Sequence, residues 1–187
     1  MIWFTSDCHF LHQNVINLNK RPFSNLDNMH EQLTFRWNLC VNPHDTIFVL
    51  GDLSLGPFTQ FRPIAERLNG TKFLIKGNHD GYSDGQYKKL GFTVFHELKM
   101  KLCGKTVRMS HYPYALPWYR LPFAYPSVKR FLDRRPPKIK GEYLMHGHTH
   151  TKYKKRGYTI HVGVDAWNYT PVSLAEIESL IDKNVDA

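Results

Sequence analysis

The sequence predicts an α/β fold in which helices cover a β-sheet, and three segments carry this prediction. Residues 46–50 form an apolar run that is typical of a strand buried on both faces. Residues 27–41 place apolar side chains at helical spacing, which indicates a helix lying on a sheet. A second helical segment, 61–68, precedes another apolar run at 73–75. Strand and helix therefore alternate along the chain, as a sheet covered by helices requires.

The size and charge of the chain limit what it can be. Its 187 residues suggest one domain, and with 42% hydrophobic and 22% charged residues it can bury a substantial core. Lys and Arg number 25 against 16 Asp and Glu, a formal net charge of +9. Such a balance favours anionic partners, namely nucleotides, nucleic acid, phosphorylated compounds or acidic lipid. A positive charge scattered over the surface is the alternative.

Other features bear on location. The chain enters its first strand without a charged and apolar leader, and no run is long enough to span a bilayer. The three cysteines, Cys8, Cys40 and Cys103, are too widely spaced for a disulfide framework or a zinc finger. We therefore expect a cytoplasmic protein with no membrane contact.

The remaining elements follow from local signals. A first strand is predicted over Ile2–Thr5, and the helices at 27–41 and 61–68 end at Asn-Pro and Asn-Gly pairs. A short helix is expected after Asp80. Further strands are predicted over residues 92–102, 106–109, 143–145 and 158–165. Ser173 and Glu176 match a capping box that opens a terminal helix.

The segment 112–140 differs from the rest because aromatic residues alternate there with prolines and arginines. One interpretation is a flap beside a binding site, whose aromatic rings stack on bases and whose arginines pair with phosphate. The other is a loop that packs its own aromatic rings and exposes its charges. For the segment as a whole we favour the flap.

Polar residues with metal-binding chemistry follow the predicted strands. Asp7 and His9 come after the first strand, and because residues two apart on a strand share a face they can reach one point. Cys8 between them points the opposite way and is interpreted as a packed thiol. Asp52 follows the strand at 46–50. Each signal alone also fits an ordinary polar strand end.

The stretch Lys76–Asp80 is the densest of these signals. Gly77 permits close backbone approach, and Asn78 offers a neutral oxygen ligand. His79 can supply a proton near neutral pH, and Asp80 can orient that imidazole. An ordinary turn also uses Gly, Asn and Asp. This stretch therefore indicates a functional site only in combination with the other motifs of the chain.

Histidines end the later strands. His111 follows one strand, and His146, His148 and His150 occupy alternate positions after another, where an extended backbone would turn them to one side. Arg21 is interpreted either as a phosphate ligand or as a solvated loop residue. His161 and Asp165 have no partners in the pattern and are expected to be structural.

Together these residues form a mixed oxygen and imidazole set without a thiolate. Such a set suits Mn, Fe, Co, Ni or Zn better than an all-oxygen Mg or Ca site. It holds more ligands than one ion needs, which two ions sharing a carboxylate, roughly 3.5–4 Å apart, would explain.

The order Asp-x-His, Gly-Asp, Gly-Asn-His-Asp, His and Gly-His-x-His resembles the calcineurin-like metallophosphoesterase superfamily, from Ile2 to about Asp165. The Arg-Pro-Phe loop at 21–23 and Trp37-Asn38 resemble its small bacterial and phage members. The resemblance implies two mixed β-sheets packed face to face with helices outside, a four-layer αββα sandwich. After Gly51-Asp52 the chain lacks the Asp-Arg-Gly run of the Ser/Thr protein phosphatases, which disfavours a phosphoprotein substrate.

The resemblance also implies a role for each residue. One ion would be held by Asp7, His9, Asp52 and His150. The other would be held by Asp52, Asn78, His111 and His148. His79 would be the general acid and Asp80 its orienting partner, while His146 is assigned no metal.

The expected activity is hydrolysis of phosphate esters with two divalent transition-metal ions, Mn first among them. A phosphodiesterase acting on nucleotides or nucleic acid is favoured. A phosphomonoesterase on a small phosphorylated metabolite is the alternative, and a non-catalytic binding scaffold of the same fold is the third possibility. No protein partner is implied.

Overall fold

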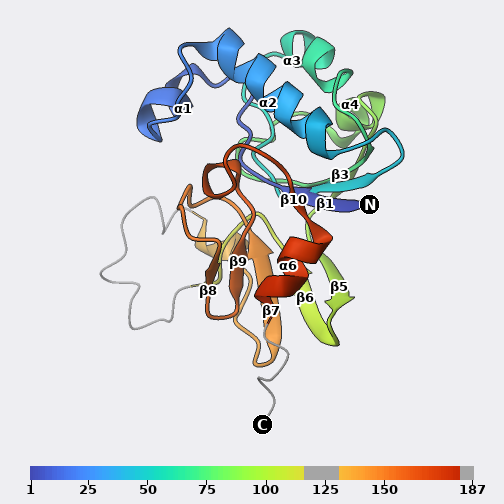
Figure 1. Cartoon of the computed structure of the whole chain (residues 1–187), viewed down its shortest axis with the longest axis vertical. Coiled ribbons are helices and arrows are strands. Elements are labelled where there is room, and N and C mark those ends of the chain that lie inside the picture. The colour runs from blue at the N-terminus through green and yellow to red at the C-terminus, as the bar shows by residue number, and fades with distance from the viewer. Residues whose placement is uncertain (116–130, 182–187) are drawn as a thin grey trace.

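The computed structural model describes residues 1–115 and 131–181. They form two five-stranded sheets, with strand orders β10-β1-β2-β3-β4 and β5-β6-β7-β9-β8. Figure 1 shows the helices α1 to α4 gathered over the first sheet and α6 beside the second. The predicted α/β fold with two mixed sheets is confirmed.

The first sheet brings three strand ends to the same edge. Its parallel strands are β1 (Ile2–Thr5), β2 (Thr46–Val49), β3 (Thr71–Ile75) and β4 (Phe92–Phe95), with β10 (Val172–Ser173) antiparallel to β1. The helices of this half are α1 (Gln13–Leu18), α2 (Leu26–Cys40), α3 (Phe58–Ala65) and α4 (Asp84–Lys89). Because β1, β2 and β3 run parallel, the residues that follow them meet at one edge of the sheet.

The second sheet supplies the other strand ends. Its strands are β5 (Leu98–Leu102), β6 (Lys105–Met109), β7 (Glu142–His146), β8 (Lys155–Arg156) and β9 (Thr159–His161). Strands β6, β7 and β9 are parallel, while β5 and β8 are antiparallel to their neighbours. Two 3₁₀ turns, η2 (Leu132–Arg134) and η3 (Val164–Ala166), and the helix α6 (Leu174–Leu180) complete this half.

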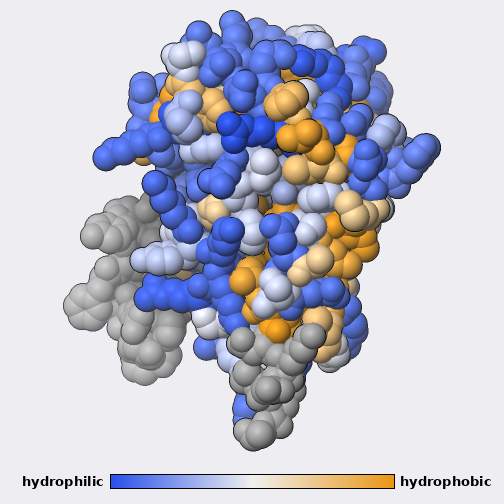
Figure 2. Space-filling view, in the orientation of Figure 1, coloured by the Kyte–Doolittle hydropathy of each residue, from blue (hydrophilic) through white to orange (hydrophobic). Residues whose placement is uncertain are grey.

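Two hydrophobic cores hold the layers together. Trp3 on β1 packs with α2 and α3, whereas its neighbour Phe4 packs with residues of the second sheet such as Tyr143 and Met145. Successive side chains of a strand point to opposite faces, so β1 is buried on both. The outer surface of the helical layer is mostly hydrophilic (Figure 2), as expected when the apolar faces of its helices turn inward.

Several element boundaries differ from the prediction. The residues predicted as one strand at 92–102 form two strands in different sheets, β4 and β5, which carry the chain from one sheet to the other. The helix predicted at 61–68 lies at Phe58–Ala65, after the extended Pro57. The strand predicted at 158–165 is shortened to β9 and followed by η3. The capping box of Ser173 and Glu176 is confirmed at α6.

Two further expectations concern the segment 112–140 and membrane contact. Residues 116–130 of that segment lie outside the described residues, and its two ends, 112–115 and 131–140, are described. Within the described ranges, no helix combines the length and the apolar character that crossing a membrane requires.

Candidate metal centre

The predicted ligands meet where the two sheets adjoin, and backbone hydrogen bonds tie their loops together. The amide of Asp7 donates to the carbonyl of Gly51 at 3.0 Å, and the amide of His9 donates to the carbonyl of Asp52 at 3.0 Å. Across the sheets, the amide of His148 donates to both carboxylate oxygens of Asp7, at 3.0 and 3.1 Å. The loop that follows β7 is therefore joined directly to the loop that follows β1.

Five ligand residues have left-handed backbone conformations. The φ angles are 58° at Asp7, 54° at His9, 52° at Asp52, 69° at His148 and 47° at His150. Non-glycine residues adopt this region at a cost of about 1–2 kcal/mol each, and such strain clusters at functional sites. The expectation that Asp7 and His9 share the face of an extended strand is wrong, because β1 ends at Thr5 and both residues have left-handed backbone angles.

The first ligand cluster consists of Asp7, His9 and His150. The Nε2 atoms of His9 and His150 are 3.2 Å apart, and His150 Nε2 lies 3.9 Å from Asp7 Oδ1. Burial raises the pKa of Asp7 and lowers that of His9 well below its ordinary value. The His9 imidazole is thus neutral at physiological pH, the form that binds metals.

The second cluster consists of Asp52, His111 and His148, with Asn78 beside it. His111 Nε2 lies 3.1 Å from His148 Nδ1 and 3.2 Å from Asn78 Oδ1. Burial lowers the pKa of His148 to about 3. Burial also opposes protonation of His111, but its hydrogen bond with Asp52 outweighs this and raises its pKa to about 9. The carboxylate therefore makes this cluster attractive to positive charge.

Asp52 lies between the two clusters and faces both. Its Oδ2 is 3.6 Å from His9 Nε2, and its Oδ1 is 3.4 Å from His111 Nε2. Burial raises the pKa of Asp52, but the hydrogen bond from His111 and the neighbouring imidazoles outweigh this and lower it. Asp52 is therefore ionised, with one oxygen toward each group of ligands.

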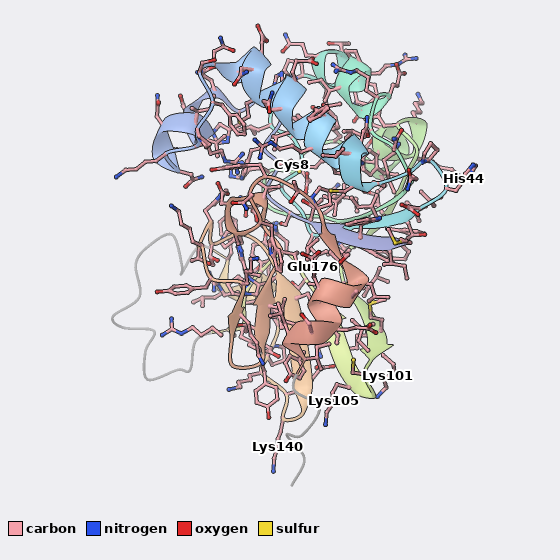
Figure 3. All side chains as sticks on the ribbon, in the orientation of Figure 1. Cys8, His44, Lys101, Lys105, Lys140 and Glu176 are labelled. Carbon is pink, nitrogen blue, oxygen red and sulfur yellow. The ribbon has the colours of Figure 1, made fainter. Side chains whose placement is uncertain are left out.

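The donor set fits divalent cations. Two imidazole nitrogens face each other at 3.2 Å in the first cluster and at 3.1 Å in the second, each pair beside a buried carboxylate. A cation placed between the two nitrogens of a pair would be bound by both, in place of any proton held there. Cys8 is excluded as a ligand, because it lies in the interior below α2 (Figure 3) and burial raises the pKa of its thiol to about 12.

Two glycines allow the loops to approach this closely. A Cβ atom on Gly77 would lie 2.2 Å from Asp52 Oδ1, and one on Gly147 would lie 2.4 Å from Asp7 Oδ2. Both distances are far below van der Waals contact. The predicted need for close approach at Gly77 is thus met, and Gly147 serves the same purpose in the loop after β7.

His150 is held from outside the first cluster by Asp165 and Arg21. Its Nδ1 donates to Asp165 Oδ2 at 2.9 Å. The side chain of Arg21 is fully buried; it donates to both Asp165 oxygens at 3.0 and 2.9 Å and to the carbonyls of Asp7 at 2.7 Å and Cys8 at 2.9 Å. Both interpretations of Arg21, phosphate ligand and solvated residue, are wrong. Asp165 was expected to be structural, and it supports the site by accepting hydrogen bonds from His150 and Arg21. Sequence reasoning missed this pair because 144 residues separate its members.

His111 and Asp80 are held mainly by backbone groups. His111 Nδ1 lies 2.8 Å from the carbonyl oxygen of Leu50, to which it donates. The carboxylate of Asp80 accepts from the amides of Asp52, Gly77 and Leu53 at 2.7, 2.8 and 2.9 Å. Among the described contacts, no hydrogen bond joins Asp80 to the His79 ring. Asp80 instead fixes the backbone of the two loops that carry Asp52 and Asn78.

His79 contacts the ligands, whereas His146 does not belong to either cluster. The His79 side chain is 36% exposed, and its Nε2 lies 3.9 Å from Asp52 Oδ2. Its ring meets His9 edge-on, with ring centroids 5.2 Å apart. His146 instead turns away from both clusters and packs against His161, at 5.3 Å between ring centroids. Of the three histidines, His148 and His150 belong to the ligand clusters and His146 does not. The extended backbone assumed for them is absent, because φ is 69° at His148 and 47° at His150.

Two cavities adjoin the ligands, and Asn78 lines both. One, of about 450 Å³, is lined by Asp52, Asn78, His79, Phe131, Arg135, His148, Thr149 and His150. The other, of about 560 Å³, is lined by Lys76, Gly77, Asn78, Asp80, His96, Glu97, Ser110, Tyr112 and Arg134. The first cavity opens directly onto the metal ligands, so we call it the reaction cleft.

Comparison with known proteins agrees with this geometry. Residues 1–104 match the family model of the calcineurin-like phosphoesterases. The chain is 31% identical over 191 residues to the uncharacterized protein MJ1445 of Methanocaldococcus jannaschii, covering 97% of this chain and 92% of that protein. It is also 31% identical over 203 residues to the Gene 66 protein of Mycobacterium phage D29, covering 97% and 96%.

A solved structure, that of the protein of unknown function AQ665 from Aquifex aeolicus, superimposes with a TM-score of 0.67 at 28% identity, covering 97% of this chain and 99% of that one. The chain belongs to the calcineurin-like phosphoesterase family. It is a phosphoester hydrolase of a family that uses divalent metals, and its two ligand clusters are where such ions fit.

Proposed function

We propose that the protein is a phosphodiesterase that acts on nucleotides or nucleic acid with two divalent ions, one in each cluster. The observation that carries this proposal is the position of Asp52, whose two oxygens face different clusters at 3.6 and 3.4 Å. Asp7, His9, Asp52 and His150 would hold one ion. Asp52, Asn78, His111 and His148 would hold the other.

Residues of the protein supply the other groups that the reaction requires. When bound, the ions neutralise phosphate oxygens and lower the pKa of water from about 15.7 toward neutrality. Asp52 and Asn78 hold their oxygens at the base of the reaction cleft. His79 lies at its wall, partly exposed, where its ring can donate a proton to the leaving oxygen. General acid catalysis of this kind contributes roughly 10²–10⁴-fold.

Three features support a nucleotide or nucleic-acid diester. The net charge of +9 favours anionic substrates. A diester has two substituents, and two cavities share Asn78 in their linings. Tyr112 and Phe131, from the two described ends of the segment 112–140, line one cavity each, which supports a substrate-side flap on a single domain.

Manganese is the ion that we expect first, with Fe, Ni, Co and Zn as alternatives. The two clusters combine four imidazoles, His9, His111, His148 and His150, with carboxylates, a set that Mg and Ca rarely choose. The free cysteines, Cys8, Cys40 and Cys103, support a reducing, cytoplasmic location.

A substrate panel tests the proposal. We expect the protein with Mn²⁺ to hydrolyse bis-p-nitrophenyl phosphate and either cyclic nucleotides or short oligonucleotides faster than p-nitrophenyl phosphate. The opposite order would establish the phosphomonoesterase. Binding of these compounds without hydrolysis of any of them would identify a scaffold.

A further inference from the structure

Arg135 lines the reaction cleft together with Asp52 and His148, and its guanidinium has no hydrogen bond or ion pair with any described residue. Its Nε is buried without an acceptor. Other buried arginines are paired: Arg21 with Asp165, and Arg108 with Glu97 and Glu142. Leaving a half-buried cation without a counterion costs free energy. The position of Arg135 beside the metal ligands therefore favours the binding of an anion there.

The position of Arg135 is fixed relative to the second cluster. Its amide donates to the carbonyl of Leu132 at 3.3 Å, closing the η2 turn, and the amide of Ala115 donates to the carbonyl of the buried Pro136 at 2.9 Å. At the start of the turn, the ring of Phe131 packs edge-on against His148, with ring centroids 5.6 Å apart. The turn is therefore attached directly to a predicted metal ligand.

Arg135 shares the lining of the reaction cleft with His148 and His150. Burial lowers the pKa of the Arg135 guanidinium, with only Tyr112 acting against it. The neighbouring Arg134 differs, because it donates to the Tyr112 hydroxyl at 3.4 Å and lines the other cavity. Two adjacent arginines thus face different cavities, and the unpaired one faces the metal ligands.

We propose that Arg135 forms a subsite that binds a non-bridging phosphate oxygen. The subsite would bind this oxygen both in the substrate and in free inorganic phosphate. The identity of the anion rests on the proposed function. An arginine fork presents parallel N–H donors that match the oxygens of a tetrahedral phosphate, which a lysine cannot reproduce. From the His148 side of the cleft, this fork would hold the phosphate while His79 meets the leaving oxygen.

Phosphate binding tests the subsite without relying on turnover. Inorganic phosphate is titrated calorimetrically into the Mn²⁺-loaded wild type, Arg135→Ala, Arg135→Lys and the charge-matched control Arg156→Ala, whose side chain is exposed on β8. We expect Arg135→Ala to bind phosphate about 10–100-fold more weakly, as loss of a charged hydrogen bond does. Arg135→Lys should be intermediate and Arg156→Ala unchanged, all with wild-type manganese content.

The outcomes separate this inference from the proposed function. If the wild type hydrolyses esters but Arg135→Ala binds phosphate as tightly as the wild type, the subsite is wrong and the proposed function stands. If no ester is cleaved but phosphate binding still depends on Arg135, the subsite stands and the proposed function fails. Absence of phosphate binding by the wild type contradicts the subsite. Should Arg135→Ala not fold, Arg135→Gln takes its place in the same comparison.

Discussion

The two ligand clusters are held in different ways. His150 of the first cluster is fixed by a buried side-chain network in which Arg21 and Asp165 join it to the loop after β1. His111 of the second cluster is fixed by the backbone carbonyl of Leu50, and its neighbour His148 lines the reaction cleft. Both clusters contribute ligands to the reaction cleft, so the difference lies in how they are supported: side-chain contacts between distant residues hold the first cluster, and a backbone carbonyl holds the second.

The largest expected effect comes from the residue that the clusters share. Asp52→Asn should lower manganese content in both clusters and reduce turnover by about 10³-fold or more, beyond the 10–100-fold typical of residues that only orient a ligand. Elemental analysis and steady-state rates measure this. Full metal content with full activity would show that Asp52 does not bridge the clusters.

His79→Ala separates metal binding from proton transfer. We expect unchanged metal content and a loss of roughly 10²–10⁴-fold on alkyl phosphodiesters, whose leaving groups need a proton. The loss should be small for p-nitrophenyl esters, because p-nitrophenolate leaves without one. Equal losses on both kinds of ester would count against His79 as the general acid.

Asp165→Asn tests the side-chain network of the first cluster. Removal of its charge should weaken one manganese site by about 10–100-fold and leave the other unchanged, since partners that orient a ligand histidine contribute this much to metal affinity. Metal titration against a chelator measures both affinities. Asp27→Asn, an exposed carboxylate in the first turn of α2, serves as the control. Equal weakening of both sites would erase the proposed distinction between the clusters.

The smallest expected effect on metal binding comes from Glu142, at the opposite end of β7 from the ligands. Burial raises its pKa, but hydrogen bonds from Lys99 and Arg108 outweigh this and lower it. A lowered pKa stabilises the fold above the unfolded value of about 4.3, and this contribution is lost as the pH falls through the folded value. Glu142→Gln should thus cost about 1 kcal/mol at pH 7, and less in acid, with both metal affinities retained. Thermal melts at several pH values check this.

What the sequence could predict follows from how local each signal is. Apolar runs predicted β1, β2 and β3, because burial on both faces leaves a continuous hydrophobic pattern. The ligands could be found because they directly follow strands. The local geometry around Asp7 and His9 could not be predicted, because both residues have left-handed backbone angles that no pattern in the sequence indicates.

Partners that are distant in the sequence were also beyond prediction. No local sequence pattern links Arg21 to Asp165. Within its own segment, each residue resembles an ordinary charged residue of the protein surface. The break between β4 and β5 was missed because the two strands are separated by only two residues, His96 and Glu97, and belong to different sheets. Such features arise only when the sheets are assembled.

A crystal structure of the manganese-loaded protein, with anomalous scattering measured at the manganese edge, tests the central claim most directly. Two peaks roughly 3.5–4 Å apart, with one Asp52 oxygen directed at each, are the result that our account predicts. A single peak, or an Asp52 side chain that contacts only one ion, would contradict it.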